Sequence, residues 1–139
     1  MAQFNVAGLD ELTNDLRAVA ALEDSIVLEM LNAEADILVD AQKNMIERLE
    51  MVDTGQLLDS IDKTPMRKGG ASRYMEVYPQ GIRDNGVRNA EVGYINEYGA
   101  PGRHIPAKNW MNRAIEDAQE DMIQAARDIY SDYLKSKNL

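Results

Sequence analysis

The sequence predicts an α+β fold, in a single domain over residues 1–139, with helices at both ends and a small antiparallel sheet between them. Two observations lead to this prediction. Apolar residues recur at intervals of three and four near both ends of the chain, whereas apolar and polar residues alternate in the middle. This order is typical of helices that pack on one face of a sheet.

The N-terminal part, residues 9–50, is predicted to form a pair of helices. Residues 9–22 carry leucines at helical spacing, and residues 26–50 have one apolar face and one acidic face. A single helix over both segments would be about 60 Å long at about 1.5 Å per residue, which exceeds the size of a small domain. We therefore expect a break near residues 23–25.

A short helix is expected after this pair, within residues 52–61. Leu57, Leu58 and Ile61 would form its apolar side, and Asp53 or Thr54 would cap its start. The segment would bring the chain back to the core after the long helix.

Strands and loops are predicted over residues 61–98. The alternation in residues 73–79 and 90–95 predicts two strands, and residues 61–66 a weaker third strand. Residues 67–72 are interpreted as a glycine-rich turn, and residues 80–89 as a loop too long for a tight hairpin.

The C-terminal helix is predicted over residues 106–135 and is expected to pack on the sheet. Apolar residues repeat at helical spacing from Met111 to Tyr133, and Pro106 suits the first position of a helix. Residues 99–105 would form an irregular connection before it.

The charge is uneven along the chain. The formal net charge is −9, and residues 1–64 hold 14 acidic and 4 basic residues, whereas residues 65–113 hold 4 acidic and 8 basic residues. The acidic total argues against sequence-specific nucleic-acid binding. The basic loops lack a nucleic-acid recognition motif. They are interpreted either as solvated loops or as contacts with a subunit or an acidic protein surface, through Arg67, Lys68, Arg83 and Arg88.

Several classes of site are disfavoured by composition. The chain has no cysteine and one histidine, so thiol chemistry and cysteine-ligated zinc are excluded, and no metal or cofactor is implied. His104 has no partner nucleophile nearby in the sequence and is interpreted as a surface or structural residue. The apolar windows are broken by acids, and residues 1–8 do not resemble a signal peptide, so no membrane association is expected.

Asp53-Thr54-Gly55 is the triplet of aspartic proteases. That chemistry needs two carboxylates sharing a proton, which a chain of this size supplies by dimerising, and a triplet at the end of a buried strand. Here the triplet follows a predicted helix, which favours a helix cap and turn. Trp110, the only tryptophan, is interpreted as a core anchor, with an interface anchor as the alternative.

Four segments in order give the chain a resemblance to a known family. They are residues 8–12, 52–61, 94–99 and 104–111, which read GLDEL, VDTGQLLDSI, YINEYG and HIPAKNWM. Together they resemble the tail-completion family (minor tail component, head–tail joining proteins) of long-tailed, lambdoid-type bacteriophages. The family's last segment usually carries Arg-Pro-aromatic, where this chain has Lys108-Asn109-Trp110.

The resemblance implies that one motif follows the long helix, that Glu-Tyr-Gly closes a strand, and that the last motif opens the final helix. It also implies a set of structural or interface residues: Asp53, Thr54, Gly55, Leu58, Ser60, Ile61, Glu97, Tyr98, Gly99, Pro106 and Trp110.

By the same resemblance the chain would be a structural protein of the virion neck or proximal tail, and not an enzyme. It would be made in the host cytoplasm and would form a ring, expected to be six-fold, around the DNA path. Its partners would be other neck and tail proteins, with genomic DNA passing through the lumen without specific binding. The alternatives are a small cytoplasmic adaptor protein and a dimeric aspartic-type protease that uses Asp53.

Overall fold

The computed structural model describes residues 23–52, 54–70 and 72–138, and it has the predicted α+β architecture. Helices and antiparallel strands follow one another along the chain, and a long C-terminal helix comes last. The predicted helix over residues 9–22 lies outside the described residues.

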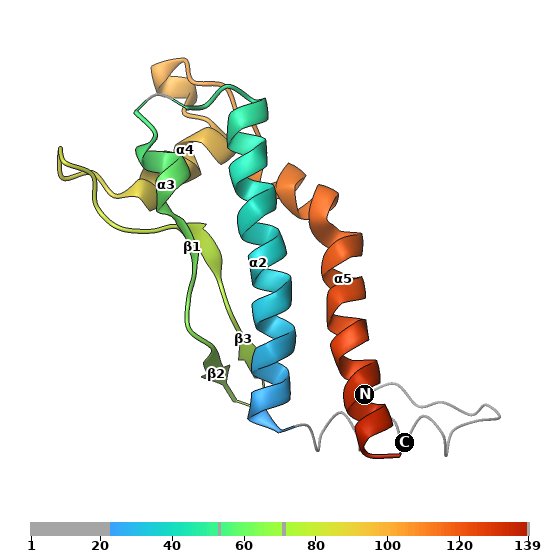
Figure 1. Ribbon diagram of the computed structural model, residues 1–139. Helices are drawn as coiled ribbons and strands as arrows, with labels where there is room; N and C mark the ends of the chain where they lie inside the picture. The colour runs from blue at the N-terminus through green and yellow to red at the C-terminus, as the bar shows by residue number, and fades with distance from the viewer. Residues whose placement is uncertain (1–22, 53, 71, 139) are drawn as a thin grey trace, which may run out of the picture.

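The long helix α2 (Asp24–Arg48) is the central element of the fold. The C-terminal helix α5 (Trp110–Ser136) runs antiparallel along one side of α2, and the strands lie on its other side (Figure 1). Most of α5 therefore packs against α2, and its first residue, Trp110, reaches strand residue Ile61 in the core. The helix pair is also joined at its surface by an ion pair between Arg48 and Asp117, 3.2 Å apart.

Helix α2 begins inside the predicted break and ends in a tight turn. Its last turn is closed by backbone bonds from Glu50 N–H to the Glu47 carbonyl and from Met51 N–H to the Ile46 carbonyl. This is a Schellman motif, which places one residue in the left-handed region, and here that residue is Glu50, with φ of 54°.

The short helix α3 (Gln56–Ser60) confirms the predicted helix, but its cap is different. The residue that caps it is Gly55, with φ of 84°, because the chain must turn sharply there. Thr54, one position before Gly55, also binds the start of the helix, because its hydroxyl accepts a hydrogen bond from Gln56 N–H at 3.3 Å. Asp53, the other expected cap, lies outside the described residues.

The strands form two antiparallel ladders of two strands each. Strand β1 (Ile61–Lys63) pairs with β4 (Val77–Pro79), and β2 (Arg67–Gly69) pairs with β3 (Ser72–Tyr74). The prediction of one strand over residues 73–79 is therefore wrong, because that segment is divided between two ladders. The predicted turn over residues 67–72 is also wrong in extent, because most of it is β-strand.

A one-residue offset separates the ladders. Three residues, 64–66, lie between β1 and β2, whereas only Met75 and Glu76 lie between β3 and β4. Pro65 is in the longer segment and has no N–H to donate to a ladder, so the pairing is interrupted there. Thr64 bridges the gap, since its backbone and hydroxyl both bond to the backbone of Glu76.

The predicted strand over residues 90–95 is wrong, because this segment lies in helix α4 (Asn89–Tyr98). The alternation of Ala90, Val92 and Tyr94 is misleading. The buried positions recur at four-residue intervals but hold Asn89, Gly93 and Glu97, which give no hydrophobic signal.

The last helix starts later than predicted. Pro106 is exposed and precedes the helix, and a single 3-10 turn, η1 (Pro101–Arg103), lies further upstream. The N–H groups of Lys108 and Asn109 donate to the carbonyls of Asn96 and Glu97 at 2.8 and 3.1 Å. These bonds satisfy the free carbonyls at the end of α4, and they hold residues 106–109 beside that helix until α5 begins.

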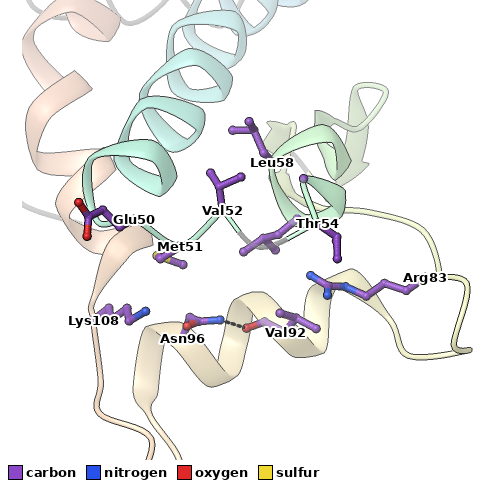
Figure 2. Close-up of a pocket in the computed structure, with 11 residues that line it drawn as sticks. Glu50, Met51, Val52, Thr54, Leu58, Arg83, Val92, Asn96 and Lys108 are labelled. Carbon is purple, nitrogen blue, oxygen red and sulfur yellow. Dashed lines mark hydrogen bonds between the residues drawn. The ribbon is translucent and has the colours of Figure 1, made fainter.

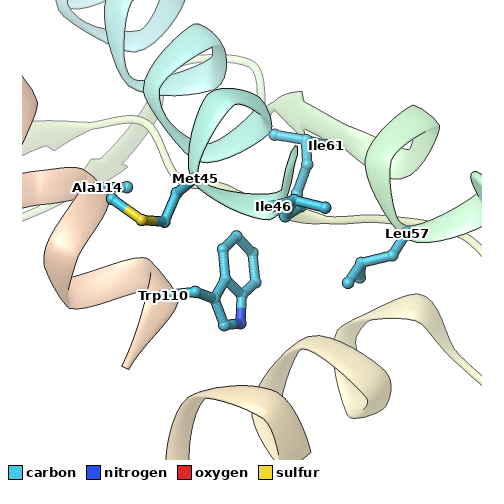
Figure 3. Close-up of a cluster of buried hydrophobic side chains, with 6 residues drawn as sticks. All are labelled: Met45, Ile46, Leu57, Ile61, Trp110 and Ala114. Atoms are coloured by element: carbon cyan, nitrogen blue, oxygen red, sulfur yellow. The ribbon is translucent and has the colours of Figure 1, made fainter. Parts of the chain in front are cut away.

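The hydrophobic core lies where α2, α3, β1 and the start of α5 meet (Figure 3). Trp110 is fully buried at its centre, which confirms the interpretation of this residue as a core anchor. The rest of the cluster surrounds the indole ring and consists of Met45, Ile46, Leu57, Ile61 and Ala114.

Candidate binding site at the junction of the short helices

The three described motif segments of the sequence meet at one junction, formed by α3, α4 and the start of α5. Residues 54–61 supply α3, residues 94–99 the second half of α4, and residues 104–111 the approach to α5. Backbone and buried polar bonds join α4 to the start of α5, and α3 is joined through Leu57 in the core. The expectation that Glu-Tyr-Gly closes a strand is wrong, since it ends a helix.

Glu97 is the polar link of this junction. Its side chain is buried, and its carboxylate accepts bonds from Met111 N–H at 2.9 Å and from Asn112 N–H at 3.2 Å. These donors belong to the first turn of α5, which has unpaired N–H groups and a partial positive charge. Glu97 therefore caps α5 from α4, a role that its position in the sequence does not reveal.

Trp110 is held by the same helix. Its indole N–H donates to the Gly93 carbonyl at 2.9 Å. A Cβ at Gly93 would lie 2.8 Å from Pro79 Cγ and 3.2 Å from Trp110 Cζ2, so only glycine lets the indole and the proline ring approach this closely.

Gly99 lies in a turn that excludes a side chain. Its φ is 77°, and a Cβ would lie 2.7 Å from the backbone nitrogen of Ala107. Tyr98 beside it is exposed instead, and it packs against Tyr94 with ring centroids 4.6 Å apart. Sequence reasoning missed this exposed tyrosine pair, because it assigned the segment to a strand.

An open pocket of about 340 Å³ lies beside the junction, between the end of α2, α3 and α4 (Figure 2). We call it the α3–α4 pocket. Its lining is partly apolar, and Arg83 and Lys108 point into it from opposite sides. It is lined by Glu50, Met51, Val52, Thr54, Gly55, Leu57, Leu58, Arg83, Val92, Asn96 and Lys108.

Arg83 is positioned by a fixed loop. Its Nε donates to Asn89 Oδ1 at 3.0 Å, and its backbone N–H and carbonyl bond to Val87 and Gly86. Asn89 is buried and also donates from Nδ2 to the Gln80 carbonyl at 2.9 Å. The predicted loop over residues 80–89 therefore presents one of its cations to the pocket in a defined orientation.

The other predicted loop cations lie elsewhere. Lys68 and Arg73 both pair with Asp24, at 3.0 and 2.6 Å, and these bonds hold the pKa of the Asp24 carboxyl below its usual value. Lys68 is thus engaged within the chain, while Arg67 and Arg88 are exposed.

Ser60 and His104, two described side chains of types used in catalysis, lie apart in the fold. Ser60 donates its hydroxyl to the Leu57 carbonyl at 2.6 Å, and His104 is exposed in a left-handed turn. Within residues 23–52, 54–70 and 72–138 no cluster of three or more potential metal ligands occurs. In the same part of the chain, no helix has both the length and the apolar character needed to cross a membrane.

No protein-family model, curated protein or solved structure matches this chain. Evidence on function therefore comes from the residues and their geometry, together with the resemblance of the motif segments.

Proposed function

We propose that this chain is a structural subunit of the neck or proximal tail of a long-tailed bacteriophage, where it acts in tail completion and head–tail joining. One observation carries the proposal. Three of the four segments that resemble the tail-completion family in sequence also join α3, α4 and α5, and the fourth, residues 8–12, lies outside the described residues. A shared junction of this kind is a reason for the motifs to occur together in one order.

In this role the chain assembles as a ring around the DNA path, with other neck or tail proteins above and below it. A ring needs two different patches that meet between neighbouring subunits. Its lumen is lined by acidic helix surface, which repels DNA and lets the duplex slide. Helix α2 alone carries six acidic and two basic residues.

Mass spectrometry of purified particles, made from the genome that encodes the chain, tests the proposal. We expect the protein in stoichiometric amounts in intact particles, and antibody labelling at the junction of head and tail. Deletion of the gene is expected to give filled heads and separate tails, and a plasmid copy is expected to restore joining. Absence of the protein from purified particles refutes the proposal.

An adaptor protein is the second candidate, and the exposed pair of Tyr94 and Tyr98 favours it. Aromatic side chains are enriched at protein interfaces, and both are 64% exposed. Gene order separates the candidates: neighbouring capsid, connector and major tail genes support the virion protein, and their absence supports the adaptor. The protease alternative is tested by exposing the chain to a peptide library, with Asp53→Asn as its control.

A further inference from the structure

We propose that the α3–α4 pocket receives the outer face of α5 from a second copy of this chain. The inference rests on the proposed function, since it identifies the contact by which a ring would grow. It comes from the shape and charge of two surfaces that lie on different parts of the described chain.

The chemistry of the pocket defines what fits it. Apolar side chains form part of its lining, among them Leu57, Leu58 and Val92, and Val52 in this lining is 47% exposed. Arg83 and Lys108 face each other across the pocket, and Glu50 is the only acidic residue among the lining residues described. A complementary surface therefore offers an exposed aliphatic side chain with carboxylates close to it.

The outer face of α5 offers this pattern. Ile123 is an aliphatic residue with 43% exposure, and Ile115, two turns earlier on the same side of the helix, is 45% exposed. Glu116 and Glu120 precede Ile123 by seven and three positions, so both carboxylates lie on its side of the helix. Both are exposed.

The charge of α5 extends this match beyond single residues. Residues 116–132 contain six acidic residues and one basic residue, Arg127. An exposed acidic surface attracts a basic surface and repels another acidic surface.

The pocket and the outer face of α5 cannot contact each other within one copy. Ile123 lies thirteen residues beyond Trp110, which is about 20 Å along the helix at about 1.5 Å per residue. The pocket, in contrast, lies at the end of α2 beside α3 and α4. A contact between different patches of two copies leaves one free patch at each end, so it grows into a closed ring or a filament.

The test uses the full chain and two charge-reversed variants. The pocket variant carries Arg83→Glu and Lys108→Glu, and the face variant carries Glu116→Lys and Glu120→Lys. Sedimentation velocity and native mass spectrometry, over a wide range of concentration at low salt, measure association. We expect the wild type to form oligomers. Each variant alone is expected to associate more weakly than the wild type by about tenfold or a larger factor, because like charges then meet at the contact.

Mixing the two variants is the decisive measurement. Each contact between unlike variants pairs opposite charges, so we expect the equimolar mixture to regain oligomers that neither variant forms alone. A control with Arg103→Glu and Lys135→Glu changes the net charge as much as the pocket variant does, and we expect it to associate like the wild type. Added salt is expected to weaken all of these contacts.

Folding of the variants is checked by thermal unfolding, because Arg83 also holds Asn89. If Arg83→Glu unfolds the loop, Lys108→Glu alone tests the pocket against the same face variant. The inference is overturned if the wild type stays monomeric throughout, if the variants associate as well as the wild type, or if the mixture does not associate.

These outcomes are independent of the test of function. If the protein is monomeric but present in purified particles, this inference is overturned and the proposed function stands. If the protein self-associates but is absent from particles, the proposed function is refuted and the contact between copies stands.

Discussion

The two ends of α2 are held in different ways. At its C-terminal end the junction of α3, α4 and α5 is fixed by buried contacts, with Glu97 capping α5 and Trp110 filling the core. At its N-terminal end the β2–β3 hairpin is attached to Asp24 through the exposed ion pairs of Lys68 and Arg73. Burial makes the first set of contacts strong and specific, and solvent weakens the second set.

This comparison predicts that stability is concentrated in the junction. Among the variants that test it, Trp110→Ala is expected to have the largest effect. Removing the buried indole leaves a cavity in the centre of the core, which is expected to lower the free energy of unfolding by about 3–5 kcal/mol. Chemical denaturation monitored by circular dichroism measures it. Tyr98→Ala, on the exposed side of α4, is the control and is expected to cost less than about 0.5 kcal/mol.

Asn109→Pro breaks the junction through the backbone. Asn109 has φ of 51° and donates its N–H to the Glu97 carbonyl, whereas proline requires φ near −65° and has no N–H. We expect a loss of about 2–4 kcal/mol, measured by the same denaturation. Asn109→Gly keeps both the φ and the N–H and is expected to be close to neutral.

This substitution also sharpens the resemblance. The tail-completion family usually has Arg-Pro at the positions of Lys108 and Asn109. If Asn109→Pro is as stable as the wild type, this chain can adopt the family's backbone there, and the left-handed turn before α5 is not required for its fold.

Glu97→Ala tests the polar link between α4 and α5. The loss of a buried carboxylate that accepts two N–H groups is expected to cost about 2–3 kcal/mol, because those groups then lack a partner. Glu97→Gln keeps one acceptor oxygen and is expected to lose about half as much. Equal stability of the alanine variant and the wild type would mean that α5 does not depend on this cap.

The sequence predicts the fold class and the elements with strong periodicity or conformational demands. The long helices follow from their apolar faces, and the burial of Trp110 follows from its size. Helix α4 was not predictable in this way, since its buried side is formed by Asn89, Gly93 and Glu97. Their burial depends on partners that are distant in the chain, such as Gln80, Trp110 and Met111.

The candidate site follows the same rule. Thr54, Gly55 and Leu58 belong to one motif, but the sequence does not show that the pocket they line also contains Arg83 and Lys108, which are distant in the chain. The role of Glu97 could not be read from the motif, because a cap supplied from another helix has no local signature. Only the positions of α4 and α5 relative to each other reveal it.

The smallest expected effect is at the other end of α2, with Asp24→Asn. Bonds from Lys68 and then Arg73 hold the pKa of the Asp24 carboxyl below its usual value in the folded protein. A lowered folded-state pKa contributes stability above the unfolded-state pKa, near 3.9, and this contribution is lost as the pH falls through the folded-state pKa. Because Asp24 is exposed, added salt also weakens the contribution of its ion pairs to stability.

The melting temperatures of wild type and Asp24→Asn are therefore expected to differ slightly at neutral pH and low salt, and to converge below about pH 4 or at high salt. Amide hydrogen exchange locates the effect, which should be faster exchange in the hairpin with unchanged exchange in α4. Faster exchange in α4 as well would mean that the two ends of α2 are coupled. The two ends would then differ in the type of contact that holds them, but not in their stability. A difference in melting temperature that persists at high salt would show that Asp24 acts through something other than its ion pairs.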